Sequence, residues 1–315
     1  MSSNKQPEFR SGLVLNPDKF YSPSYRISPF RTEDVAANLQ LRQSDLALKE
    51  LDRRFAGRKW CFTESGKEGI ALALEALALK SGDCITILTT SGNFYISGCV
   101  TREIEKVCNW SREIQDNTTA LFVNHEFGYP YRNLSELRRY GLPIIEDACH
   151  SYLADTSACD MGRVGDFIIF SLPKIFPLQI GGVLSFDPSY NLESRIQRGG
   201  EQETYITKVM SHYIPELEIT RERRLANYFH LAQLFATLGC YPRFELLPND
   251  VPGVFIFTLP MNIDLAALKE HVIAHGIECS VFYGENAFFI PVHQRLCEAD
   301  LAYFHSVFSS FIARH

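Results

Sequence analysis

The chain has 315 residues, of which 46% are hydrophobic and 22% charged, and its 31 basic and 37 acidic residues give a formal net charge of −6. This length is enough for about two domains whose hydrophobic cores need neither disulfides nor metals. The acidic balance argues against a protein that binds the phosphate backbone of nucleic acids, because such proteins carry an excess of basic residues. No apolar run approaches the roughly 20 residues of a membrane-spanning helix, and the polar residues 1–10 lack the apolar core of a signal peptide. We therefore expect a cytoplasmic protein with no nucleic acid or membrane partner.

The nine cysteines are scattered along the chain, and no two of them have C-x-x-C spacing. Their odd number and irregular spacing are not those of a disulfide framework or a zinc site. Free cysteines in a reduced compartment act mainly as small buried hydrophobic residues. We expect no disulfide and no metal site.

The first half of the chain predicts an α/β sheet. Residues 1–34 contain several Pro, Ser and aromatic residues with little periodicity, which indicates an extended N-terminal arm, and a helix is expected over Glu33–Phe55. From there to residue 190, short apolar strands alternate with helical segments, a pattern typical of a sheet covered on both faces. The expected strands are Lys59–Thr63, Ile85–Thr90, Ala120–Asn124, Pro143–Glu146, Phe167–Leu172 and Gly182–Phe186. The expected helices between them are Ile70–Leu79, which is apolar almost all round, and Leu134–Tyr140.

The second half predicts a small α+β domain. Its expected elements are a long helix over Ile219–Leu238, a strand over Val254–Leu259, a helix over Asp264–His275, strands near Ile277–Phe282 and Ala287–Pro291, and a last helix over Glu298–Ala313. We therefore divide the chain into an N-terminal arm (1–34), a large domain (35–190) and a small C-terminal domain (191–315).

Two interpretations fit the residues ahead of the apolar helix. Ser65 and Glu68 have the S-x-x-E spacing of a helix-capping box. The same place also suits an anion, because the first N–H groups of a helix bind phosphate, Gly66 permits close approach and Lys67 adds a positive charge. The negative charge of Glu68 works against the second interpretation.

Two further segments carry residues that can do chemistry. Asp147 ends a predicted buried strand and His150 follows it, and ligands of α/β sheets bind at the carboxyl ends of strands. An acid there either holds a protonated ring nitrogen or a metal, or caps the next turn. Lys174 lies in an apolar stretch between two strands. Its amine either is desolvated and forms an imine with an aldehyde, or extends to the surface.

Together these three features are what pyridoxal phosphate (PLP) requires of a protein. The helix start anchors the phosphate, the acid keeps the pyridine nitrogen protonated, and the lysine holds the aldehyde as an imine. The combination is more specific than any of its parts.

Over about residues 55–190, the chain resembles the fold-type I, PLP-dependent sugar aminotransferases of the DegT–StrS type. The matching segments are Ser65-Gly66 with IALALEALALKSGD, Phe127-Gly128-Tyr129-Pro130, IIEDACHS, and Gly165-Asp166 through FSLPK to Gly181-Gly182. The resemblance implies an α/β PLP-transferase fold like that of aspartate aminotransferase, with a mostly parallel central sheet and a small C-terminal α+β domain. It also implies a homodimer with the active site at the subunit interface.

The resemblance assigns catalytic roles to two residues. Lys174 would hold the PLP aldehyde as an imine and move the proton during the reaction. Asp147 would pair with the pyridine nitrogen, and His150 would lie near the ring hydroxyl.

The resemblance also assigns cofactor contacts. Backbone N–H groups of Gly66 and Lys67 and the hydroxyl of Ser171 would bind the phosphate. Phe94 would stack on the ring, in an alignment that needs a shift of one residue.

We expect a PLP-dependent aminotransferase that moves an amino group from an amino acid, glutamate in our hypothesis, to a keto sugar that is nucleotide-linked. Three departures from the family leave alternatives open: Lys67 stands where the family has Thr or Ser, the Ser171–Lys174 interval is short, and no Asn-x-Arg segment lies between Glu201 and Ile219. One alternative is a PLP-fold protein that acts as a regulator or partner subunit. Another is a PLP-dependent sugar dehydratase, although that branch resembles one with His at the lysine position, so Lys174 favours transamination.

Overall fold

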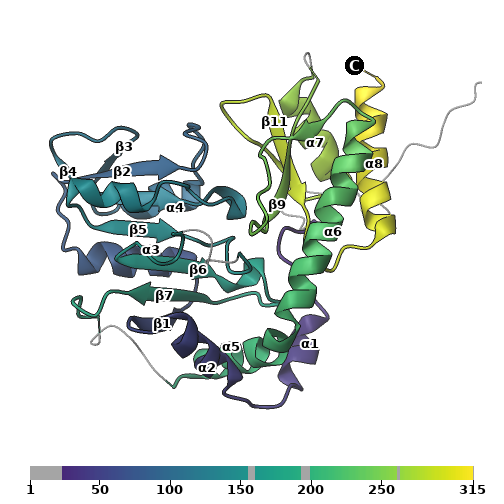
Figure 1. Cartoon of the computed structure of the whole chain (residues 1–315). Helices are drawn as coiled ribbons and strands as arrows, with labels where there is room; N and C mark the ends of the chain where they lie inside the picture. Colours follow the sequence, from purple (N-terminus) through teal and green to yellow (C-terminus); the bar gives the residue numbers. More distant parts are fainter. Residues whose placement is uncertain (1–22, 155–159, 193–198, 261–262, 315) are drawn as a thin grey trace, which may run out of the picture. The chain divides into compact units, whose positions relative to one another are not determined.

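The structure, a computed structural model, describes residues 23–154, 160–192, 199–260 and 263–314 (Figure 1). Most of the expected arm, residues 1–22, and Cys159 lie outside the described residues. The chain forms two compact units. The larger unit comprises Ser28–Glu222 and Leu246–Gly253, and the smaller unit comprises the described residues through Ile27, Arg223–Glu245 and those from Val254 onward. The division into domains at residues 34 and 190 stays a prediction.

The larger unit is built on a seven-stranded sheet in the order β1-β7-β6-β5-β4-β2-β3. Its strands are β1 (Lys59–Thr63), β2 (Cys84–Thr89), β3 (Asn109–Ser111), β4 (Thr118–Asn124), β5 (Ile144–Asp147), β6 (Phe167–Ser171) and β7 (Gly182–Phe186). Strands β2 to β6 run parallel, whereas β7 pairs antiparallel with both β6 and β1. The expected α/β fold with a mostly parallel central sheet is confirmed, and only the short β3 was not foreseen.

Helices cover both faces of this sheet (Figure 1). They are α1 (Asp34–Leu39), α2 (Leu46–Arg54), α3 (Gly66–Ala76), α4 (Gly98–Ile104), α5 (Glu201–Tyr213) and the short 3-10 helices η1 (Glu126–Gly128), η2 (Ser135–Tyr140), η3 (Leu172–Lys174) and η4 (Ile214–Glu216). Successive side chains of a strand point to opposite faces. Thus Phe167 and Ile169 of β6 join a core with α3 and α4, while Ile168 and Phe170 join a core with α2 and α5.

The single helix expected over Glu33–Phe55 is wrong, because two helices, α1 and α2, occupy this range. Between them, Ser44 Oγ accepts a hydrogen bond from Leu46 N at 3.3 Å. Ser211 of α5 accepts from Ala47 N at 2.9 Å and donates to Ser44 O at 3.0 Å. Side-chain hydrogen bonds of this kind compete with intrahelical ones, so the chain turns and restarts. The partner on α5 is remote in sequence, which is why the local pattern did not reveal the break.

A second correction concerns the helix expected over Leu134–Tyr140. This segment forms the 3-10 helix η2, which ends at Gly141 with φ 64°. A left-handed residue of this kind favours glycine and stops a helix. Helices α4 and α5 were not expected from the sequence at all.

The smaller unit has the α+β composition expected. It contains an antiparallel sheet in the order β10-β11-β9-β8, with β8 (Tyr241–Pro242), β9 (Val254–Thr258), β10 (Ser280–Val281) and β11 (Ala287–Pro291). Its helices are α7 (Leu265–Ala274), α8 (Glu298–Ile312) and the part of α6 (Leu217–Ala236) from Arg223 onward. Of the chain's helices within the described ranges, none has the length and apolar character to cross a membrane.

Strand register at one edge of the large sheet brings distant segments together. Thr63 of β1 pairs with Gly182 of β7, which pairs on its other side with Ser171 of β6. A Cβ atom at Gly182 would lie 2.5 Å from Thr63 Oγ1 and 2.9 Å from the carbonyl oxygen of Phe170. The close approach therefore requires glycine. It places the start of α3 and the end of β6 at the same edge.

We expect Gly182→Ala to lower the free energy of unfolding by about 1–3 kcal/mol, because the added methyl group overpacks a site bounded by backbone atoms. Chemical denaturation of the purified protein measures this loss. Gly82→Ala is the matched control, because nothing lies within 4 Å of the Cβ position there. Equal stability of the two variants would contradict the proposed constraint.

Candidate active site

A cavity of about 250 Å³ opens at the carboxyl ends of β4, β5 and β6, beside the start of α3. In parallel sheets such strand ends share one edge, and ligands bind there. Six of the seven residues singled out in the sequence line this cavity: Gly66, Lys67, Asp147, His150, Ser171 and Lys174. The fold therefore brings together residues from three separate segments of the chain.

The start of α3 has the expected capping box, and its geometry is compatible with the expected anion site. Ser65 is the N-cap, and its Oγ accepts a hydrogen bond from Glu68 N at 3.4 Å. The Glu68 side chain accepts from Glu64 N, which turns its charge to the N-cap side. The first N–H groups of a helix have no intrahelical acceptor, so those of Gly66 and Lys67 remain for an external anion. The capping box and the anion site are thus compatible.

Gly66 cannot be replaced at this place without a collision. A Cβ atom there would lie 2.8 Å from Cys149 Sγ. Burial raises the pKa of the Cys149 thiol well above its ordinary value, so a neutral sulfur packs against the helix start. The arrangement leaves the backbone of Gly66 exposed to the cavity.

Asp147 lies at the end of β5 with only 8% of its surface exposed. Its Oδ1 accepts a hydrogen bond from Cys149 N at 3.1 Å, so the carboxylate does cap the next turn. Burial raises the pKa of Asp147, and the hydrogen bond from Cys149 and the nearby positive charge of Lys174 oppose that rise. A buried carboxylate in a cavity, with its pKa raised by desolvation, is typical of functional sites.

Lys174 reaches the same cavity despite the short interval after Ser171. Strand β6 ends at Ser171, and the 3-10 turn η3 follows at once, with Pro173 in its first turn. Leu172 N donates to Gly181 O at 3.1 Å, which fixes the start of this turn. A single tight turn thus leaves both Ser171 and Lys174 on the cavity wall.

Phe94 is the one residue of the seven that does not line the cavity. Its side chain is 71% exposed, and its neighbour Tyr95 takes the place on the wall. The rings of Tyr95 and Phe127 stack with their centroids 6.1 Å apart, and the Phe127 ring lies 5.3 Å from that of His150. These three rings form an aromatic wall. The one-residue shift in the alignment explains why the sequence pointed to the neighbour.

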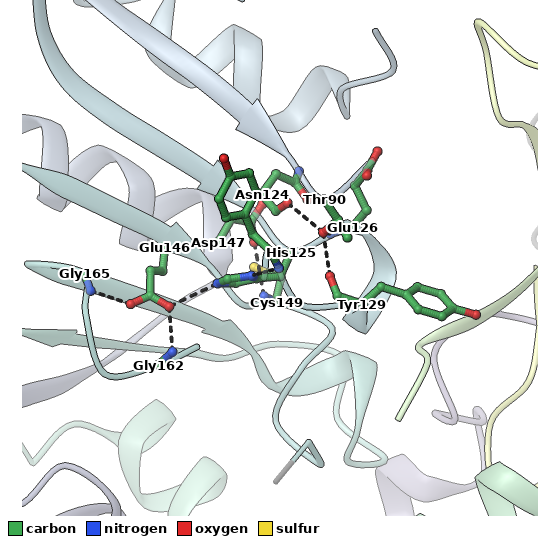
Figure 2. Close-up of polar contacts among 11 residues, drawn as sticks. Thr90, Asn124, His125, Glu126, Tyr129, Glu146, Asp147, Cys149, Gly162 and Gly165 are labelled. Carbon is green, nitrogen blue, oxygen red and sulfur yellow. Dashed lines mark hydrogen bonds and ion pairs between the residues drawn. The ribbon is translucent and has the colours of Figure 1, made fainter. Parts of the chain in front are cut away.

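The sequence did not foresee the buried pair of His125 and Glu146 (Figure 2). His125 Nδ1 accepts a hydrogen bond from Tyr131 N at 3.0 Å, so the proton lies on Nε2, which donates to Glu146 Oε2 at 3.0 Å. Glu146 also accepts from the backbone N–H groups of Gly162 and Gly165. His125 stands directly after β4. In the sequence, only this position at the end of a strand pointed to a role for His125 near the cavity.

A second polar network holds the loop after β2 to η1 (Figure 2). Thr90 Oγ1 donates to Tyr129 O at 2.6 Å and accepts from Glu126 N at 3.1 Å. Glu126 Oε2 accepts from Ser91 N at 2.6 Å. These contacts fix the loop that carries Tyr95 against the segment that carries Phe127. Among the residues that the structure describes, no group of three or more His, Cys, Asp or Glu could hold a metal ion.

No protein-family model matches the chain, and no curated protein matches it. Solved structures do. The aminotransferase TlmJ from Streptoalloteichus hindustanus aligns with a TM-score of 0.71 at 15% identity, over 92% of this chain and 99% of that one. The Streptococcus pneumoniae protein Spr1654, provisionally described as a sugar aminotransferase and solved in its PLP form, aligns with a TM-score of 0.70 at 14% identity, over 93% of this chain and 99% of that one.

A third similar structure is a DegT/DnrJ/EryC1/StrS aminotransferase from Brucella abortus, with a TM-score of 0.65 at 14% identity over 89% of this chain and 93% of that one. These alignments extend over almost the whole of each chain. The chain therefore has the fold of these PLP-dependent aminotransferases, as its own short motifs had indicated.

The raised pKa of Asp147 predicts that the cofactor-free protein becomes less stable as the pH rises above 3.8. Its raised pKa means that the folded chain binds more protons than the unfolded chain between the ordinary pKa of 3.8 and the raised value. The free energy of unfolding therefore falls as pH rises through this window. We expect Asp147→Asn to be more stable than the wild type at pH 7, because the amide oxygen still accepts from Cys149 N while no buried charge remains.

This difference should shrink as the pH falls toward 3.8. Denaturation curves across the pH range measure it, with the exposed Asp116→Asn as control. A wild type that is the more stable protein at neutral pH would refute the interpretation.

Proposed function

We propose that the chain is a PLP-dependent aminotransferase that moves an amino group from an amino acid to a keto sugar. The observation that carries the proposal is that Lys174, Asp147 and the start of α3 face one cavity. Glutamate as the donor, a nucleotide-linked sugar as the acceptor, a cytoplasmic location and a homodimer belong to the same proposal. The homodimer rests on the sequence resemblance.

The residues of the cavity fit PLP. A phosphate group suits the N–H groups of Gly66 and Lys67, the Lys67 ammonium and the Ser171 hydroxyl, because all of them are donors or positive. Gly66 has no side chain, and a Cβ atom there would meet Cys149 Sγ, so its backbone N–H is accessible to a phosphate group. The charge of Lys67 takes the place of the hydroxyl usual in the family.

When bound, PLP supplies an aldehyde that condenses with amines and a pyridinium ring that withdraws electrons. Lys174 Nζ would hold the aldehyde carbon and, as a free amine, would move a proton at the substrate carbon. Asp147 would accept a hydrogen bond from the ring nitrogen, and its negative charge would keep a proton there. The buried position of this carboxylate strengthens that interaction, since water does not screen it.

The relatives in structure support the choice of reaction. Spr1654 is solved in PLP and PMP forms, and DesV from S. venezuelae is solved with a ketimine intermediate. Those forms belong to amino transfer. The sugar acceptor rests on the description of Spr1654 and on the sequence resemblance.

We expect the purified wild type to bind PLP with visible absorbance, and borohydride to attach the pyridoxyl group to the peptide that contains Lys174. Lys174→Ala should abolish this attachment, because the variant lacks the amine that would form an imine with the PLP aldehyde. Mass spectrometry of the digested protein measures it, with Lys80→Ala, in an exposed turn, as control. Attachment that survives in Lys174→Ala, or a wild type that binds no PLP, would refute the assignment.

Product analysis separates the three candidate functions. We expect added glutamate to bleach the bound cofactor's absorbance in a half-reaction, and Asp147→Asn to slow this step by about 10²–10³-fold, because one electrostatic contact to the reacting system is lost. Stopped-flow absorbance measures the rate, and mass spectrometry of the sugar product shows gain of an amine. Loss of water without gain of an amine would identify a dehydratase, and a bound cofactor that no amino acid converts would favour the regulator.

A further inference from the structure

Residues Leu246–Gly253 belong to the larger unit, although the residues on either side of them in the chain belong to the smaller one. We call this segment the clasp. It lies outside every motif that the sequence analysis singled out. Its contacts reach two residues of the aromatic wall.

The clasp is anchored by an ion pair whose carboxylate is buried and whose guanidinium is partly exposed. Asp250 is 1% exposed, and its Oδ2 lies 2.5 Å from Arg132 Nη2. The same oxygen accepts a hydrogen bond from Leu247 N at 3.0 Å, and Asp250 N donates to Leu247 O at 2.9 Å. Val251 is fully buried in the core that includes Ala148, next to Asp147. Leaving the buried Asp250 carboxylate without its hydrogen-bond donors is costly, so these contacts hold the clasp in place.

The end of the clasp rests on His150 itself. A Cβ atom at Gly253 would collide with His150 Nδ1 and lie 2.9 Å from both Cβ and Cγ of that ring. The structure therefore brings the Gly253 backbone into direct packing with the imidazole. No side chain fits between the two.

The clasp also fixes Phe127. Gly253 N donates to Phe127 O at 2.6 Å, and a Cβ atom at Gly128 would lie 2.7 Å from Val251 O. Phe127 has φ 51° and ψ 28°, a left-handed conformation that is strained for a residue with a side chain. Such strain persists only where the surroundings hold it, and it concentrates at functional sites. The clasp supplies one side of that support, and the network around Glu126 supplies the other.

We propose that the clasp positions His150 and Phe127 for cofactor binding, with Gly253 and Asp250 as positioning residues that do not touch the cofactor. The inference rests on the proposed function, since it takes PLP as the ligand of the cavity. A displaced His150 ring would lose its place beside the cofactor, and binding would weaken although every contacting residue is still present. Misplacement of a contacting group by a fraction of an ångström is enough for such a loss.

The experiment compares Gly253→Ala and Asp250→Asn with Gly82→Ala, whose Cβ position has nothing within 4 Å. Two readouts are measured on each full-length variant. The first is the His150 signal in the NMR spectrum of cofactor-free protein with labelled histidine, identified as the signal that His150→Gln removes. The second is the Kd for PLP from an absorbance titration.

We expect Gly253→Ala to move the His150 signal and to raise the Kd for PLP about tenfold or more, and Asp250→Asn to change both readouts in the same direction. Gly82→Ala should leave the signal in place and the Kd within about twofold of the wild type. If Gly253→Ala does not fold, Asp250→Asn carries the test alone.

An unmoved His150 signal in the folded variants would overturn the inference, whatever their Kd. A wild type that binds no PLP would instead overturn the proposed function, and the His150 signal would still decide whether the clasp positions that ring.

Discussion

The close pairing of three backbones at Thr63, Gly182 and Ser171 is the constraint on which the cavity depends. It joins β1, which leads into α3, to β6, which leads into Lys174, although more than half of the larger unit separates them in sequence. Because the Gly182 position admits no Cβ atom, the helix start and the strand end approach closely enough to face one cavity. Parallel pairing of β4, β5 and β6 then adds Asp147 at the same edge.

The two neighbouring carboxylates at the end of β5 show how environment separates structural from chemical roles. Glu146 is surrounded by donors: the imidazole of His125 and the N–H groups of Gly162 and Gly165. Glu146 is fully buried and is not among the residues that line the cavity, so these hydrogen bonds stabilise the fold. Asp147 points to the cavity, receives a hydrogen bond from Cys149 N, and has its pKa raised by burial. A buried charge that costs stability in the absence of a ligand is an arrangement that a cofactor would make favourable.

The positions at which the chain departs from the family it resembles, Lys67 and the interval after Ser171, lie at the cavity. The short interval after Ser171 forms a 3-10 turn, in which residues three apart project to the same side, so Ser171 and Lys174 both line the cavity. Lys67 supplies charge where a hydroxyl is usual, and the carboxylate of Glu68 is turned toward Glu64 N. At 12–15% identity to Spr1654 and TlmJ, the chain shares their fold and places these residues around one cavity.

The sequence by itself determined the alternation of strands and helices, the capping box at Ser65, and the strand-end position of Asp147, because each depends on residues that are close in the chain. It did not determine the break between α1 and α2, the pair of His125 with Glu146, or the choice of Tyr95 over Phe94 for the cavity wall. Each of these depends on a partner far away in the sequence or on the exact direction of a loop. The clasp is the extreme case: only tertiary packing returns Leu246–Gly253 to the larger unit, where the absence of a side chain at Gly253 allows its backbone to lie against His150.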